Sequence, residues 1–145
     1  MISSMIRARS GPPALLLIAV LVFMVPVSPH ADDKDSAIQA TILKQIEAFA
    51  NDDDEAAWRV ASDGIKRRFG SSDVFMAMVK QAYPAVHRAN AIEFMRRVPH
   101  GDFEIQVVRL KGPEGKRWDV FYRMVQVEDE WKIGGVQMQP ADLGI

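Results

Sequence analysis

The sequence predicts an α+β domain in which three helices precede a curved, four-stranded antiparallel sheet. Apolar residues recur every three or four positions between residues 35 and 83, and then at every second position between residues 91 and 138. A chain of 145 residues has room for one such domain. A run of helices followed by a run of strands is typical of α+β folds, in which the helices pack on one face of an antiparallel sheet.

The first 31 residues are predicted to form a secretory signal peptide that precedes the domain. Arg7 and Arg9 come before an unbroken apolar run at residues 14–25, and small residues lead up to Ala31. The run is short for a membrane span, which needs about 20 residues. Cleavage after Ala31 would leave 114 of the 145 residues as a periplasmic or secreted protein. The alternative is an uncleaved segment that anchors the protein in the membrane.

Three helices are expected in the first half of the domain, which is taken as residues 32–139 with a C-terminal tail at residues 140–145. They run from Asp35 to Ala50, from Glu55 to about Arg68, and from Ser71 to the residue before Pro84. Each has an apolar stripe: Ile38, Ile42, Ile46 and Phe49; Trp58, Ala61, Ile65 and Phe69; Val74, Phe75, Met78, Val79 and Ala82. Gly64 weakens the second helix, so irregular backbone is expected between Ser62 and Gly64.

Four strands joined as a meander are expected in the second half. They cover Ala91–Val98, Phe103–Leu110, Lys116–Val127 and Trp131–Met138. Turn residues separate them, and the pair Gly134-Gly135 predicts a bulge or bend inside the last strand.

The third strand indicates how the sheet is used. One face carries Trp118, Val120, Tyr122 and Met124, and the other carries Asp119, Phe121, Arg123, Val125 and Val127. One face is expected to pack on the helices. The second face is half apolar, although antiparallel sheets usually leave one side wet. It is therefore expected either to join two copies of the chain in a homodimer or to line a pocket.

A set of residues spread over the domain resembles a known family. The set comprises Arg68-Phe69-Gly70, Phe75, Met78-Val79, Tyr83, Val86, Arg88, Phe94, Trp118, Tyr122 and Trp131-x-Ile133-x-Gly135. In these residues the chain is similar, over residues 35–138, to the exported bacterial domain of unknown function 4864. The resemblance implies a nuclear-transport-factor-2-like cone, in which helices close the mouth of a curved sheet. It implies no activity, because that fold hosts isomerases, dehydratases, immunity proteins and binding modules.

The candidate ligand-binding residues are Tyr83, His87, Arg88, Trp118 and Tyr122. Tyr83, His87 and Arg88 follow the third helix where it meets the sheet, and a guanidinium beside an imidazole can hold an anion. The alternative is that Tyr83 and Arg88 fix this corner, with Arg88 paired to a nearby acid. Trp118 and Tyr122 could line an aromatic cavity or belong to the ordinary core.

The preferred hypothesis is a non-catalytic periplasmic module that binds a small apolar or anionic ligand, or a partner protein, and forms a homodimer through its sheet. The alternative hypothesis is a cone-fold isomerase or dehydratase in which His87 or Asp119 acts as the acid or base. Asp119 could instead pair with Arg123, four residues further along the same strand face.

Several other classes are disfavoured by composition. The sequence contains no cysteine, which excludes disulfides, thiol catalysis and a lipid anchor. With three histidines and no pair at helical spacing, no metal and no cofactor is expected. The net charge is −1, or −3 when Arg7 and Arg9 are removed (16 basic and 19 acidic residues), whereas a nucleic-acid-binding domain would be basic.

Overall fold

The computed structural model describes residue 11 and residues 31–142, so most of the predicted signal peptide lies outside the described residues. The helices are α1 (Ala31–Ala50), α2 (Asp54–Arg59), α3 (Asp63–Phe69), α4 (Ser72–Ala82) and α5 (Pro84–His87). The strands are β1 (Asn90–His100), β2 (Phe103–Lys111), β3 (Arg117–Val127) and β4 (Glu130–Pro140). The strands pair antiparallel in the order β1-β2-β3-β4, which confirms the predicted α+β class. No helix of the described part has the length and apolar character needed to cross a membrane.

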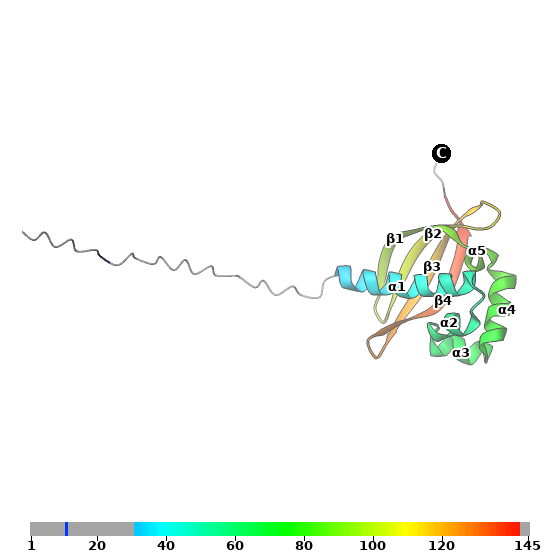
Figure 1. Cartoon of the computed structure of the whole chain (residues 1–145), viewed down its shortest axis with the longest axis horizontal. Helices are drawn as coiled ribbons and strands as arrows, with labels where there is room; N and C mark the ends of the chain where they lie inside the picture. The colour runs from blue at the N-terminus through cyan, green and yellow to red at the C-terminus, as the bar shows by residue number, and fades with distance from the viewer. Residues whose placement is uncertain (1–10, 12–30, 143–145) are drawn as a thin grey trace, which may run out of the picture.

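The helices form one layer and the sheet forms the other. Figure 1 shows α1 running across the strands, with the shorter helices gathered towards one side of the sheet. The core between the layers contains Ile38, Ile42, Ile46 and Phe49 from α1, and Val108, Leu110, Val120, Tyr122 and Met124 from the sheet. Val120, Tyr122 and Met124 are completely buried, which confirms that this face of β3 packs on the helices.

The second expected helix is divided into α2 and α3 slightly before the predicted position. The Ser62 N–H donates to the carbonyl of Ile133, and the Ile133 N–H donates to the carbonyl of Val60, both at 2.9 Å. These two bonds form a parallel bridge between Ala61 and Ile133 on the outer edge of β4. The Ser62 hydroxyl then accepts from the Ile65 N–H and caps α3. The N–H of Ser62 and the carbonyl of Val60 therefore bond to the edge of β4, so they are not available for hydrogen bonds that would continue the helix.

Two further helix boundaries differ from expectation. α1 begins at Ala31, four residues before Asp35. Pro84 does end α4, but it also starts the one-turn helix α5, because the fixed φ of proline suits a first helical position and its missing N–H has no partner to lose there. This extra turn reverses the chain between α4 and β1 and determines where His87 and Arg88 point.

The bulge predicted at the two glycines of β4 is confirmed. Arg123 pairs with Gly135 and Met124 pairs with Ile133, so Gly134 is the additional residue. A Cβ atom at Gly134 would lie 2.9 Å from Nη1 of Arg123, and one at Gly135 would lie 3.9 Å from Cβ of Arg123. Both positions would therefore direct a side chain to the outer face of the sheet, and towards the helices they present only backbone.

The first half of α1 is held to the sheet by buried charges. The Glu104 side chain is 8% exposed and the Arg97 side chain 15% exposed. Arg97 Nη1 donates to Glu104 at 2.9 Å, and Lys34 Nζ donates to the other oxygen of Glu104 at 3.1 Å. Arg97 Nε also donates to Asp35 of α1. The carboxylates of Asp35 and Glu104 raise the pKa of Arg97, so this group carries a fixed charge.

The Tyr122 hydroxyl is fully buried and has no hydrogen-bond partner among the described residues. Burial raises the pKa of Tyr122, because the apolar surroundings cannot solvate a phenolate. A buried hydroxyl without a hydrogen bond lowers the free energy of unfolding relative to the ring hydrogen that phenylalanine carries at the same position.

Tyr122→Phe is therefore expected to raise the free energy of unfolding by about 1 kcal/mol. The midpoint of urea unfolding, followed by circular dichroism, measures this change. A lower midpoint for the variant would show that the hydroxyl is hydrogen-bonded in solution, contrary to this expectation.

Candidate functional site

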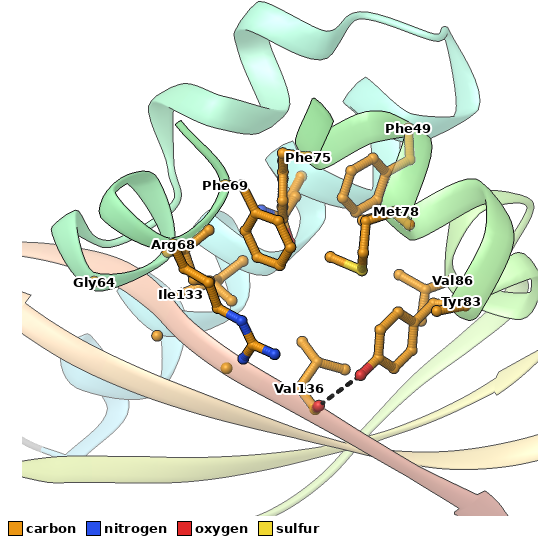
Figure 2. A pocket seen from close by; sticks show the side chains of 16 residues that line it. Phe49, Gly64, Arg68, Phe69, Phe75, Met78, Tyr83, Val86, Ile133 and Val136 are labelled. Atoms are coloured by element: carbon orange, nitrogen blue, oxygen red, sulfur yellow. Dashed lines mark hydrogen bonds between the residues drawn. The ribbon is translucent and has the colours of Figure 1, made fainter. Parts of the chain in front are cut away.

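The main apolar cavity lies between α3, α4 and β4 and has a volume of about 490 Å³. Its labelled lining residues in Figure 2 include Phe49, Phe69, Phe75, Met78, Val86 and Ile133. The volume is within the range of small-molecule sites, roughly 300–1,000 Å³. A larger groove of about 710 Å³ runs along α1, but nearly half of its lining residues are charged, with both signs represented.

Phe75 organises the apolar wall of the cavity. Its ring centroid lies 5.7 Å from those of Trp58 and Phe69 and 6.0 Å from that of Phe49, all in tilted orientations. The helical spacing of α4 places Met78 one turn further along the same wall. Four aromatic side chains from four segments therefore fix the shape of this wall.

Three polar side chains and a strip of backbone complete the lining, and one of them, Gln45, donates to the carbonyl of Ala57 at 3.2 Å. Arg68, at the end of α3, and Tyr83, just after α4, extend towards one another over β4 in Figure 2. The Tyr83 hydroxyl donates to the carbonyl of Val136 at 3.5 Å, which is a long hydrogen bond. Gly134 and Gly135 add bare backbone to the same side of the cavity. The apolar cavity therefore has one polar side, formed by Arg68, Tyr83 and the β4 bulge.

Of the predicted ligand-binding residues, His87 and Arg88 do not line this cavity. His87 Nε2 lies 2.7 Å from one carboxylate oxygen of Asp52, and Arg88 Nη2 donates to the other oxygen at 2.8 Å. Arg88 Nη1 donates to the carbonyls of Phe49 and Ala50 at 2.7 and 3.2 Å, at the end of α1. These contacts agree with the alternative interpretation from the sequence, in which Arg88 fixes this corner and pairs with a nearby acid.

Asp52 is the acid at this corner, and its backbone has a φ of 52°, in the left-handed region. Aspartate tolerates this conformation better than most residues do, which explains why the loop after α1 can turn so sharply. Hydrogen bonds from Arg88 and then His87 hold the pKa of Asp52 well below its usual value. A charged corner consisting of Asp52, His87 and Arg88 thus joins the end of α1 to α5.

Trp118 and Tyr122 lie apart from the main cavity lining. Tyr122 belongs to the core, where it is completely buried. Trp118 lines a separate cavity of about 310 Å³ together with Pro113, and Lys116 Nζ lies 4.3 Å from the centroid of its ring. A ligand-binding role for these residues remains a prediction.

Asp119 lies on the sheet face away from the helices and pairs with Arg109 of the adjacent strand. Arg109 Nε and Nη2 donate to its two oxygens at 2.8 and 3.0 Å. The same bonds hold the pKa of Asp119 below its usual value. The structure does not bring Asp119 and His87 together, and Asp119 pairs with Arg109 in place of Arg123.

The family model described as "Domain of unknown function (DUF4864)" matches residues 31–143. The chain belongs to this family. The resemblance drawn from the sequence is therefore confirmed. No curated protein matches the chain.

Two solved structures are similar to this DUF4864 protein. An NTF-2-like protein of unknown function from Silicibacter pomeroyi DSS-3 is 20% identical, with a TM-score of 0.55 over 77% of this chain and 99% of the other. An NTF2-like protein of unknown function from Shewanella baltica OS155 is 11% identical, with a TM-score of 0.49 over 79% and 100% of the two chains. The first similarity shows that the fold is nuclear-transport-factor-2-like.

Among the predicted ligand-binding residues Tyr83 lines the cavity, but the cavity itself was not predicted from the sequence. Phe75 and Met78 were expected on the apolar stripe of their helix, and Phe75 is buried there, whereas Arg68 is exposed and lines the cavity from the end of α3. The available signal was Arg68-Phe69-Gly70, in which a cation and a ring stand directly before the glycine that ends the helix. Among the described residues, no three His, Asp or Glu side chains gather closely enough to hold a metal ion. In the part of the chain that the structure describes, the lining of the DUF4864 cavity is thus mainly apolar, with Gln45, Arg68 and Tyr83 as its polar side chains.

Proposed function

We propose that this DUF4864 protein is a non-catalytic module that binds a small, largely apolar molecule in the cavity between α3, α4 and β4. The observation that carries the proposal is a cavity of about 490 Å³ whose walls are aromatic and aliphatic. Such walls favour an apolar ligand because each group moved out of water contributes free energy in proportion to the area buried. The predicted signal peptide would place this binding in the periplasm or outside the cell.

The contacts of His87 and Asp119 support binding over the enzymatic alternative. Each group is engaged by a charged partner, Asp52 and Arg109 respectively, and neither lines the cavity. A general acid or base has to lie within hydrogen-bonding reach of the reacting group. In this arrangement His87 joins the end of α1 to α5, and Asp119 joins β3 to β2.

Met78→Trp is expected to fill the cavity and to weaken binding of N-phenyl-1-naphthylamine, a neutral apolar dye that fluoresces in apolar surroundings, at least about tenfold. Val74→Trp is the matched control, because Val74 lies one turn earlier on α4 and is 49% exposed. The control is expected to bind the dye as the wild type does. Equal binding by all three folded proteins would place the dye elsewhere and refute the proposed site.

The second part of the proposal is a homodimer formed through the outer face of the sheet. Phe121 and Val125 lie half-buried on this face, and the Arg109–Asp119 pair lies beside them. Interfaces between subunits typically combine an apolar, aromatic-containing centre with polar groups at the rim. Light scattering is expected to give twice the mass of one chain, and a strict monomer at high concentration would rule the dimer out.

A further inference from the structure

Within the described part of the chain, Arg68 is the only charged residue that lines the main cavity. No carboxylate of the described residues lies within ion-pair distance of its guanidinium. Its recorded interaction is with the ring of Phe69, whose centroid lies 5.4 Å from Cζ of Arg68. Stacking of this kind holds a guanidinium in place and leaves its N–H groups available to a ligand.

A second hydrogen-bond donor stands across the cavity from Arg68. Figure 2 shows the Tyr83 side chain extending towards β4 from the opposite side, with its hydroxyl at the carbonyl of Val136. That bond is 3.5 Å long, so little is lost if the hydroxyl turns to a better acceptor. The polar side of the cavity thus offers N–H and O–H donors to one small acceptor group.

We propose that the ligand of this cavity is an amphipathic monocarboxylate. Its carboxylate accepts hydrogen bonds from Arg68 and Tyr83, and its apolar body packs on Phe69, Phe75 and Met78. This inference rests on the proposed function and adds the chemical class and the orientation of the ligand.

The charge and the geometry of the donors favour a carboxylate. The fork of a guanidinium matches the two oxygens of a carboxylate, and one positive charge balances one negative charge. A phosphate carries more charge than one arginine balances, and no second cation of residues 31–142 lines the cavity. A neutral ligand would leave the positive charge of Arg68 unpaired at the edge of the cavity, whereas a carboxylate pairs with it.

The test is displacement of N-phenyl-1-naphthylamine from the full-length protein by decanoate and by decanol, at neutral pH and below micelle-forming concentrations. The two compounds share one hydrocarbon body and differ only in the head group. An apolar cavity without a cation would prefer decanol, because burying a carboxylate costs more than burying a hydroxyl. We expect decanoate to bind about tenfold more tightly than decanol.

Substitutions then assign the preference to named groups. Arg68→Gln is expected to weaken decanoate about tenfold and to leave decanol unchanged, which removes the preference. Tyr83→Phe is expected to weaken decanoate about threefold, as for one hydrogen bond. The control is Arg67→Gln, which removes an equal charge from an exposed neighbour that does not line the cavity and is expected to change neither affinity.

The outcomes distinguish this inference from the proposed function. If decanol binds at least as tightly as decanoate, or if Arg68→Gln leaves decanoate binding unchanged, the carboxylate assignment is overturned. The cavity itself is still supported in that case if Met78→Trp abolishes decanol binding. If the wild-type protein binds the dye but neither compound displaces it, the carboxylate assignment falls alone. If the wild-type protein binds none of the three compounds, both proposals fall.

Discussion

Arg97→Met is expected to lower the free energy of unfolding by about 3 kcal/mol, because it leaves the buried carboxylate of Glu104 with Lys34 as its remaining cation. The side chain of Lys34 is 46% exposed, so it compensates the charge of Glu104 only in part. The variant also loses the bond from Arg97 to Asp35, which holds the first half of α1 to β1. Urea unfolding followed by circular dichroism measures the change.

The double variant Arg97→Met/Glu104→Leu separates the charge effect from a packing effect. It removes both buried charges, and it is expected to recover most of the stability lost in the single variant. Arg96→Met, at an exposed neighbouring position, is the matched control and is expected to change stability by less than about 0.5 kcal/mol. A double variant no more stable than Arg97→Met would contradict the explanation by unpaired charge.

Arg88→Met is expected to lower the free energy of unfolding by about 2 kcal/mol. The Arg88 guanidinium donates to two carbonyls at the end of α1 and to Asp52, and each lost bond contributes about 1 kcal/mol before allowance for solvent, to which the side chain is 42% exposed. Thermal unfolding of the wild type and of Arg88→Met measures this loss of stability, and Arg67→Met is the control. Arg67 is exposed, and its loss is expected to have little effect.

The pH dependence of the stability lost in Arg88→Met shows how much of that loss comes from the ion pair with Asp52. Asp52 has a depressed pKa in the folded protein, so its contribution is present above its unfolded pKa, about 3.9, and is lost as the pH falls below that value. The difference in stability between wild type and Arg88→Met should therefore be largest near neutral pH and shrink below about pH 4. A difference that stays constant down to pH 2, roughly two units lower, would assign the whole effect to the carbonyl bonds.

The sheet was the part of the fold most accessible to sequence reasoning. Alternation of side chains along a strand is a local property, so the third strand could be divided into faces from its own residues. Gly134 and Gly135 predicted the bulge, because a pair of glycines inside a strand is also a local feature of the sequence. The faces of the third strand and the bulge in β4 are thus each determined by a few adjacent residues.

The break between α2 and α3 depends on a contact that is distant in sequence. The helical stripe of Trp58, Ala61 and Ile65 continues through the break without interruption. Backbone bonds to Ile133, some seventy residues later, compete with the helix at this point. Gly64 predicted irregular backbone close to this point, but local periodicity carries no information about the Ile133 partner that fixes the break at residues 60–62.

The same limitation applies to the candidate site. Tyr83, His87 and Arg88 are close in sequence and were expected to act together, but the one-turn helix α5 directs Tyr83 to the cavity and the other two to Asp52. Both the acid and the carbonyls that engage Arg88 lie more than thirty residues earlier in the chain. Arg68 is exposed, and its position at the cavity depends on β4, which passes beneath it in Figure 2, so the residues next to it in the sequence do not locate the cavity.

The bridge between Ala61 and Ile133 also bears on how the protein behaves at high concentration. β4 is an outermost strand, and unpaired N–H and C=O groups along such a border are a template for the addition of strands from other molecules. The segment from Val60 to Ser62 occupies the N–H and the C=O of Ile133, and the bulge at Gly134 bends the border directly beside it. An incoming strand finds no straight, continuous row of partners along this stretch of the sheet, which protects the native protein from intermolecular β-aggregation at this border.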